Sequence, residues 1–233
     1  MSIVLEYKEI SKSFGEKQVL KNVNLKLESN KIIGLLGKNG SGKSTLFKLA
    51  NDLLTPTSGE VLVDGKPISV ESKEIIAYLP ERPYLDPNLK VCDAIKLFET
   101  FYADFDKEKA ENLLIDLDLD KNMRLSKMSK GMKEKVQLVL VMSRRAKLYI
   151  LDEPLGGVDP ASRDYILQTI LKNFDENATL LISTHMIADI EKILDEVVFI
   201  DNGEIILQDN ADELRKKENG SIDEIFRRKF YVG

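Results

Sequence analysis

The sequence predicts an α/β fold, with a mostly parallel central sheet, an N-terminal antiparallel β subdomain and an inserted α-helical subdomain. Three observations support this prediction. Residues 31–50 pass from a short apolar segment through a glycine-rich turn into an amphipathic helix. Short apolar segments typical of buried strands recur at 75–79, 148–151 and 178–182. Between them, residues 88–140 have apolar side chains at helical spacing and no convincing strand.

The composition fits a single large domain. The 233 residues are 43% hydrophobic, and the net charge of −5 argues against a general electrostatic hold on nucleic acid. One cysteine, Cys92, cannot form an internal disulfide, which favours a reducing compartment. The chain has neither a signal-peptide pattern nor an apolar run near the ~20 residues that span a bilayer. We expect a cytoplasmic protein that touches a membrane only through a partner.

We expect one domain over residues 1–233, with a core of residues 1–87 and 141–233 and a helical subdomain of residues 88–140. At the N-terminus, residues 4–7 and 19–27 are predicted strands, and the second alternates apolar with polar side chains.

Residues 11–17, between these strands, are predicted to form a polar loop in which Phe14 stands beside a glycine. An aromatic ring there can stack on a nucleobase, but it can equally cover the sheet edge. The local sequence leaves both interpretations open.

A phosphate-binding motif follows the buried strand predicted at 31–36. It matches G-x-x-x-x-G-K-[ST] through Gly37, Lys38, Asn39, Gly40, Ser41, Gly42, Lys43 and Ser44, and Thr45 follows directly. In this context backbone N–H groups and a helix N-terminus converge on phosphate oxygens. The lysine is expected on the β- and γ-phosphates and the following serine on Mg²⁺. The motif therefore predicts a P-loop NTPase that binds a nucleoside triphosphate.

The middle of the chain is predicted in order from turn and period signals. Residues 60–63 and 66–70 form a hairpin around an Asp-Gly turn, and a buried strand at 75–79 ends at a stiff Pro-Glu-Arg-Pro loop that carries Glu81. The helical stretch ends near the peptide Met-Ser-Lys-Gly-Met at 128–132, where Ser129 is a plausible N-cap of the next helix.

Acidic residues end the apolar strand at 148–151. Because unpaired buried carboxylates are costly, Asp152 and Glu153 need a reason to be there. A metal in the same cleft supplies one, with Asp152 suited to Mg²⁺ and Glu153 to polarising the attacking water.

The only histidine of the chain, His185, follows the strand at 178–182. Ligands of doubly wound sheets bind beyond the carboxyl ends of the strands, which favours a functional role for this side chain. A helix at 186–194, a hairpin with an Asn-Gly turn and two short helices at 211–218 and 222–230 complete the prediction.

These motifs, in this order and spacing, resemble the nucleotide-binding subunit of ATP-binding cassette (ABC) transporters over nearly the whole chain. The resemblance implies that Phe14 stacks on adenine and that residues 37–45 are the Walker A loop. It implies that residues 148–152 are Walker B and that Glu153 is the catalytic carboxylate. By the same resemblance, Asp159 belongs to a loop that crosses a dimer interface, and His185 senses the γ-phosphate.

Two motifs depart from the family pattern. The usual signature peptide is Leu-Ser-Gly-Gly-Gln, and of its central residues Ser129 and Gly131 remain, the two expected to bind the γ-phosphate. Glu81 replaces the usual glutamine that contacts Mg²⁺ and relays the state of the site to the membrane partner. The Lys-Gly-Met form of the signature resembles a subgroup of small bacterial exporters linked to antibiotic or peptide resistance.

The resemblance implies a mechanism and partners. Two subunits, identical or paralogous, close head-to-tail around two ATP molecules, and hydrolysis lets them part and drives a transmembrane permease at the inner face of the cell membrane. A soluble ABC ATPase that remodels an assembly shares all of this chemistry and is the alternative. A P-loop kinase or GTPase is disfavoured, because the chain has an Asp-Glu-Pro run and lacks the guanine-reading Asn-Lys-x-Asp.

Overall fold

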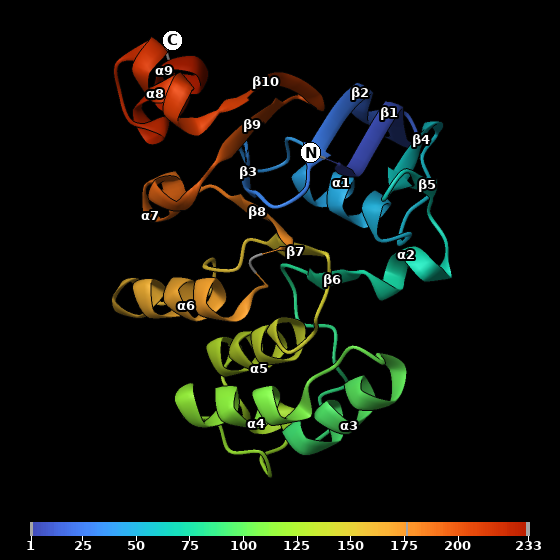
Figure 1. Ribbon diagram of the computed structural model, residues 1–233, viewed down its shortest axis with the longest axis vertical. Coiled ribbons are helices and arrows are strands. Elements are labelled where there is room, and N and C mark those ends of the chain that lie inside the picture. The colour runs from blue at the N-terminus through green and yellow to red at the C-terminus, as the bar shows by residue number, and fades with distance from the viewer. Residues whose placement is uncertain (1, 176, 232–233) are drawn as a thin grey trace.

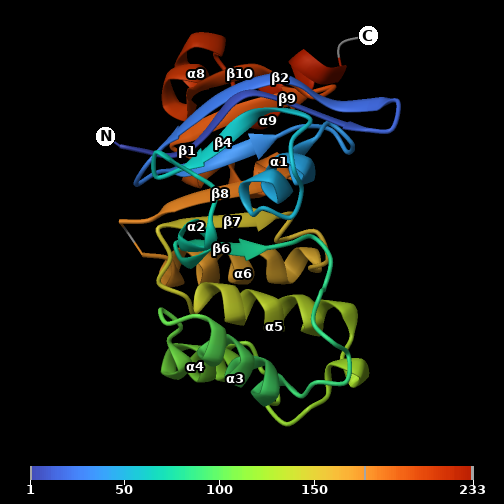
Figure 2. The ribbon, with the colours of Figure 1, turned by 90° about the vertical axis from the view of Figure 1, so that its right-hand side faces the viewer.

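The computed structural model describes residues 2–175 and 177–231 and confirms the predicted α/β class. Figures 1 and 2 show two β-sheets in the upper and middle parts of the molecule and a helical part below them. Every helix in the described part of the chain is too short or too polar to traverse a lipid bilayer.

The larger sheet has the strand order β10-β9-β3-β8-β7-β6. Its strands are β3 (Ile32–Leu36), β6 (Ile76–Leu79), β7 (Leu148–Asp152), β8 (Thr179–Thr184), β9 (Glu196–Asp201) and β10 (Glu204–Asn210). All pairs are parallel except β9 with β10, which form the predicted hairpin. Leu148 and Tyr149, neighbours on β7, belong to different hydrophobic clusters, so both faces of this sheet are buried.

The smaller, antiparallel sheet has the order β2-β1-β4-β5. Its strands are β1 (Ile3–Phe14), β2 (Lys17–Glu28), β4 (Ser58–Val63) and β5 (Lys66–Pro67). The polar loop predicted at 11–17 is wrong in extent, because β1 continues to Phe14 and β2 begins at Lys17. Gly15, with φ of 59°, closes the connection in two residues, so the hairpin needs no longer loop.

The helices that accompany the sheets are short. They are α1 (Lys43–Ala50), α2 (Val70–Glu74), α6 (Pro160–Asn173), α7 (Ile187–Ile190), the 3₁₀ turn η2 (Glu191–Ile193), α8 (Ala211–Glu218) and α9 (Ile222–Tyr231). Two expectations fail here. The strand predicted at 66–70 stops at Pro67, because the Ser69 N–H donates to the Ser72 hydroxyl and starts α2. The helix predicted at 186–194 is a single α-turn continued by η2.

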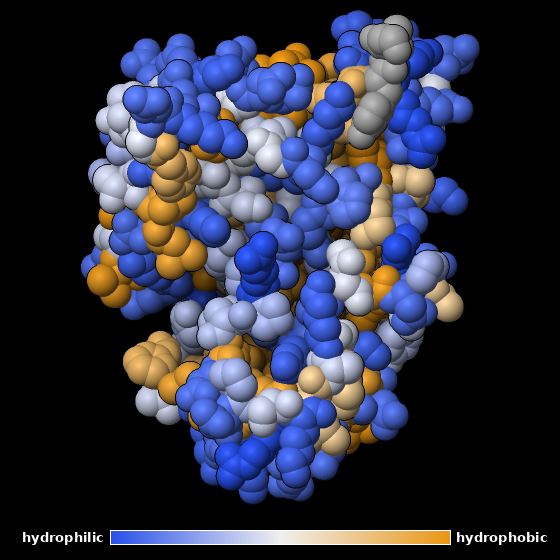
Figure 3. Space-filling view, turned by 180° about the vertical axis from the view of Figure 1, so that it is seen from behind, coloured by the Kyte–Doolittle hydropathy of each residue, from blue (hydrophilic) through white to orange (hydrophobic). Residues whose placement is uncertain are grey.

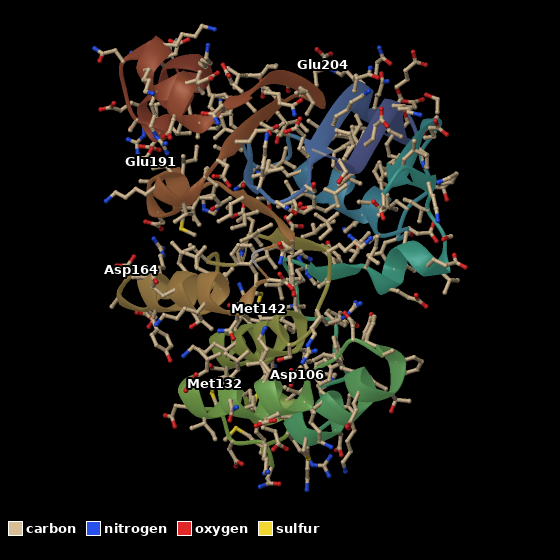
Figure 4. The ribbon with its side chains drawn as sticks, viewed as in Figure 1. Asp106, Met132, Met142, Asp164, Glu191 and Glu204 are labelled. Carbon is tan, nitrogen blue, oxygen red and sulfur yellow. The ribbon has the colours of Figure 1, made fainter. Side chains whose placement is uncertain are left out.

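The lower part of the molecule is helical (Figure 1). It contains α3 (Val91–Phe101), α4 (Lys107–Asp116), the 3₁₀ turn η1 (Leu125–Lys127) and α5 (Lys130–Met142). Met132 and Met142 mark the two ends of α5 in Figure 4. The subdomain boundaries at residues 88 and 140 stay a prediction.

Candidate functional site

The carboxyl ends of four parallel strands meet at one edge of the larger sheet. Leu36 of β3 pairs with Thr184 of β8, Asp152 of β7 pairs with Ser183 of β8, and Leu79 of β6 pairs with Leu151. The residues that follow these strand ends are the P-loop, Glu153, His185 and the loop with Glu81. The topology therefore gathers all four segments at the same rim.

The P-loop has a backbone that only glycine allows at two points. A Cβ on Gly37 would lie 2.4 Å from the Ile200 carbonyl oxygen, so no side chain fits there. Gly42 has φ of 115° and immediately precedes α1, whose first residue is Lys43. The loop thus turns directly into a helix N-terminus, which exposes backbone N–H groups to an anion.

Lys43 is buried, with 6% of its surface exposed. Its Nζ donates to the carbonyl oxygens of Gly37, at 2.7 Å, and Lys38, at 3.2 Å. Burial lowers the pKa of this ammonium, while the nearby carboxylates of Glu153, Asp152 and Glu81 oppose the shift. A buried cation held by neutral carbonyls is well suited to take a phosphate instead.

Asp152 is 2% exposed and accepts a hydrogen bond of 2.6 Å from the Ser183 hydroxyl. Burial raises the pKa of this carboxyl, against the hydrogen bonds from Ser183 and Ser44. Ser44 and Asp152 therefore offer two oxygen donors at one place, which is a donor set that Mg²⁺ prefers.

Within the described residues, no three His, Cys, Asp or Glu side chains lie together as a complete metal site. Mg²⁺ commonly takes one or two protein ligands and fills its other positions with phosphate oxygens and water. The residues present fit such a shared site.

Glu153 stands in an unusual backbone conformation, with φ of 51°. Its N–H donates to the Ser183 carbonyl oxygen at 3.1 Å, which fixes the turn at the end of β7. The carboxylate Oε2 lies 2.9 Å from the Nδ1 of His185, and Oε1 lies 3.8 Å from the Nζ of Lys43. Oε1 is buried and accepts no hydrogen bond, so one oxygen of this carboxylate is available to another donor.

A cavity of about 670 Å³ opens over these groups. It is lined by residues of the P-loop, the strand ends and the start of α5: Asn39, Gly40, Gly42, Lys43, Ser44, Thr45, Glu81, Arg82, Pro83, Lys130, Glu134, Glu153, Gly156, Gly157 and His185. Two residues of β2, Lys17 and Val19, also line it.

A second, larger hollow of about 860 Å³ adjoins the first. It lies between the larger sheet and the helical part, and Ser44, Glu81 and Asp152 are among its lining residues. Figure 3 shows a hollow at the edge of the molecule with hydrophobic surface on both sides. Ser44 and Glu81 line both spaces, so the candidate metal ligands stand where the two hollows meet.

Other predicted site residues do not line the cavity. Phe14 lies at the end of β1, is 47% exposed, and has the Nζ of Lys12 at 5.0 Å from its ring centre. Ser129 and Asp159 are the N-caps of α5 and α6, where their side chains accept from the N–H groups of Met132 and Ser162. Gly131 lies in the first turn of α5.

Sequence reasoning missed several cavity residues. Glu134 follows Lys130 by one helical turn, and its Oε1 lies 3.6 Å from the Lys130 Nζ. Its i,i+4 spacing from Lys130 could have predicted that both side chains lie on the same face of the helix. Lys17 and Val19 carry no motif signal, because the start of β2 meets the P-loop only in the folded chain, where the Val19 carbonyl oxygen would lie 3.5 Å from a Cβ on Gly42.

Comparison with known proteins gives consistent matches. The sequence profile of a family described as "ABC transporter" matches residues 20–156. The chain is 31% identical to the ABC transporter ATP-binding protein YtrB of Bacillus subtilis over 92% of its length and 74% of the relative. It is 30% identical to the lantibiotic transport ATP-binding protein SrtF of Streptococcus pyogenes over 94% and 97% of the two chains.

Solved structures agree in fold. A structure described as the ATP-binding subunit of an ABC transporter superposes with a TM-score of 0.86 at 28% identity, over 97% of this chain and 98% of that one. A dimeric bacterial ABC transporter cassette superposes with a TM-score of 0.78 at 23% identity, over 89% and 98%, and shows the fold alone.

Proposed function

The chain belongs to the ABC transporter family as an ATP-binding subunit, and we propose that it hydrolyses ATP to ADP and phosphate. The observation that carries this proposal is the Glu153 carboxylate, which lies between the Lys43 ammonium and the His185 imidazole and has one oxygen that accepts no hydrogen bond. A carboxylate in this position can accept a hydrogen bond from a water molecule that attacks the γ-phosphate.

The chain's own residues act mainly by position and charge. Lys43 would exchange its two carbonyl partners for the β- and γ-phosphates, and the backbone N–H groups at the start of α1 would bind the remaining oxygens. His185 donates its Nδ1–H to Glu153, because a carboxylate can only accept, and so orients that side chain. The leaving ADP needs no covalent help from the protein.

Ser44, Asp152 and Glu81 are the residues that we propose for Mg²⁺. When bound, the ion would neutralise charge on the phosphate oxygens. Glu81 adds a negative charge where the family pattern has a neutral amide.

We also propose that each ATP site is completed by a second copy or a paralogue. Ser129 and Gly131 are not among the lining residues of this chain's own cavity, and Ser129 is exposed at the start of α5. A helix N-terminus in such an exposed place is suited to the phosphate of a facing subunit. Asp159 would lie in the same interface. The dimeric state of a related cassette supports this arrangement.

The transmembrane partner would dock in the larger hollow. Leu53, Tyr84, Phe98 and Tyr102 give it an apolar lining, and Glu81 connects it to the ATP cavity. A docked helix of a permease would sense the metal site through that loop, and residues 88–140 would move as a unit. Such docking would hold the chain at the inner face of a membrane through its partner.

The direct test is Lys43→Ala in the isolated chain. Loss of the buried ammonium should weaken ATP binding at least tenfold, because the triphosphate loses its main cationic contact. Isothermal calorimetry with Mg·ATP measures this, and Lys48→Ala is the control, an exposed lysine of the same helix outside the ATP cavity. Unchanged affinity in Lys43→Ala would reject the assigned site.

A further inference from the structure

The P-loop is contacted from behind by the C-terminal helix. The Nζ of Lys38 donates to the carbonyl oxygen of Phe230, near the end of α9, at 2.5 Å, and lies 5.8 Å from the centre of that ring. Lys38 is the second residue of the phosphate motif, yet it is not among the lining residues of the ATP cavity. Its side chain therefore has a different task from that of Lys43.

Helix α9 is held in place by aromatic packing at one end and by a hydrogen bond at the other. The rings of Phe226 and Phe230 stack at 4.0 Å, and both meet Phe199 edge-on, at 5.4 and 6.0 Å. Phe199 is paired in the sheet with Leu36, the residue before the P-loop. At the other end of α9, the Asp223 N–H donates to the carboxylate of Glu191 at 3.0 Å, and Figure 4 shows Glu191 next to the α8–α9 pair.

The chemistry of the contact suits a cation. The last carbonyl groups of an α-helix have no partner within the helix and carry the negative end of its dipole. An ammonium that donates to one of them is stabilised by both effects. Phe230 is only 9% exposed, so little water competes for this bond.

Lys38 also contacts Lys43, the lysine that we propose for the β- and γ-phosphates. Its own carbonyl oxygen accepts from the Nζ of Lys43 at 3.2 Å. Lys38 thus connects α9 with Lys43: its side chain donates to α9, and its backbone carbonyl oxygen accepts from Lys43.

We propose that Lys38 is a positioning residue and that α9 is a buttress which holds the P-loop in the conformation that binds ATP. None of the described residues of α9 lines the ATP cavity, so the helix acts on the P-loop through Lys38 and through the packing of its two phenylalanines on Phe199. The inference rests on ATP binding at the P-loop and not on the proposed hydrolysis. A change at the end of α9 should therefore alter the affinity for ATP more than the rate of the chemical step.

The test compares variants at both ends of the contact. Lys38→Met keeps the side-chain length and removes the charge, and Lys38→Arg restores a cationic donor. Lys38→Met should weaken Mg·ATP binding about tenfold, the effect of one charge-assisted hydrogen bond, and should raise KM with kcat within about twofold. Lys38→Arg should recover most of the affinity.

Two truncations give the matched control. Deletion of residues 230–233 removes the acceptor and should reproduce the loss seen in Lys38→Met, without a further loss when the two changes are combined. Deletion of residues 231–233 keeps Phe230, whose carbonyl oxygen then belongs to the terminal carboxylate and can still accept from Lys38, so this variant should bind ATP at least as tightly as the full chain.

Three results would overturn the proposal: full affinity in Lys38→Met, additive losses in the combined variant, or a fall in kcat with KM unchanged. Lys38→Met leaves the aromatic cluster intact, so the proposal can be tested even if the longer truncation does not fold. Wild-type binding of ATP, measured in the same series, tests the proposed function separately.

Discussion

Glu153 illustrates how the backbone serves the site at the scale of a single residue. Its positive φ is a conformation that few residues other than glycine adopt, and it lies directly after a fully buried strand. The hydrogen bond from its N–H to Ser183 keeps the turn in place. The consequence is a carboxylate aimed at both His185 and Lys43.

Asp152 gives a prediction about pH. Because burial raises the pKa of Asp152, the ionised carboxylate destabilises the folded state. The loss of stability is absent when the pH is below the ordinary aspartate pKa of about 3.9, and it is complete when the pH is above the raised pKa of the folded state. In the metal-free, nucleotide-free chain, Asp152→Asn should therefore melt at a higher temperature than wild type at pH 7.5. The difference should shrink as the pH is lowered toward 4. Calorimetric melting in EDTA measures it, and a lower Tm for the variant at pH 7.5 would contradict the prediction.

Phe14 has two interpretations that an affinity measurement separates. Its ring is half exposed, and stacking on adenine would make Phe14→Ala weaken ATP binding roughly tenfold, as loss of a base–aromatic stack does. A residue that only covers the sheet edge would leave the affinity unchanged. Phe101→Ala is a suitable control, since that ring is 73% exposed on α3.

The sequence predicted which strand ends meet at one rim of the sheet, and it did not predict the contacts of that rim with distant parts of the chain. Lys43, Asp152, Glu153 and His185 follow strands that could be recognised from apolar segments, and parallel pairing brings such ends together. The contact of Lys38 with Phe230 joins residues 192 positions apart, and no local pattern encodes it.

At the scale of elements, Arg144 holds the helical part to the sheet. Its guanidinium donates to the carbonyl oxygens of Ile76 and Glu74, at 2.7 and 2.5 Å, and to the Asp104 carboxylate at 2.9 Å. It also lies 3.8 Å from the centre of the Tyr102 ring. One buried side chain after α5 thus connects the α3–α4 region with β6.

Arg144→Met should lower the free energy of unfolding by about 3 kcal/mol, because two carbonyl oxygens lose their guanidinium donor and the partly buried Asp104 carboxylate keeps only the backbone N–H of Arg145. Urea unfolding measures the change. Arg145→Met is the control: its side chain is exposed and pairs with Asp106, which Figure 4 shows near the start of α4. A loss for Arg144→Met no larger than that for Arg145→Met would contradict the role of Arg144.

Of the elements that the sequence did not predict, α2 is set by a local hydrogen bond. The hairpin strand at 66–70 lost its second half to α2 because of one serine cap. The sequence predicted α1, α8 and α9 closely, since apolar side chains share one buried face in each.

At the scale of the whole molecule, the site looks incomplete within one chain. Its own cavity lacks Ser129 and Gly131, the two signature residues expected to meet the γ-phosphate. A second copy that faces this rim would supply them, and bound ATP would hold the two copies together. The affinity of the two subunits for each other should then be high with ATP bound and should fall once ATP is cleaved.

The measurement that tests this account most directly is the mass of Glu153→Gln in Mg·ATP, by light scattering coupled to size exclusion. Loss of the carboxylate should stop hydrolysis without loss of binding and trap a dimer, while the nucleotide-free variant stays a monomer. Adding Gly131→Asp should abolish the dimer, because its carboxylate would repel the phosphates of the facing subunit. The monomer should tolerate the substitution, since only the Gly157 carbonyl oxygen lies within 4 Å of a Cβ at position 131. A Glu153→Gln chain that binds ATP and remains a monomer, or that still hydrolyses ATP at the wild-type rate, would contradict the account.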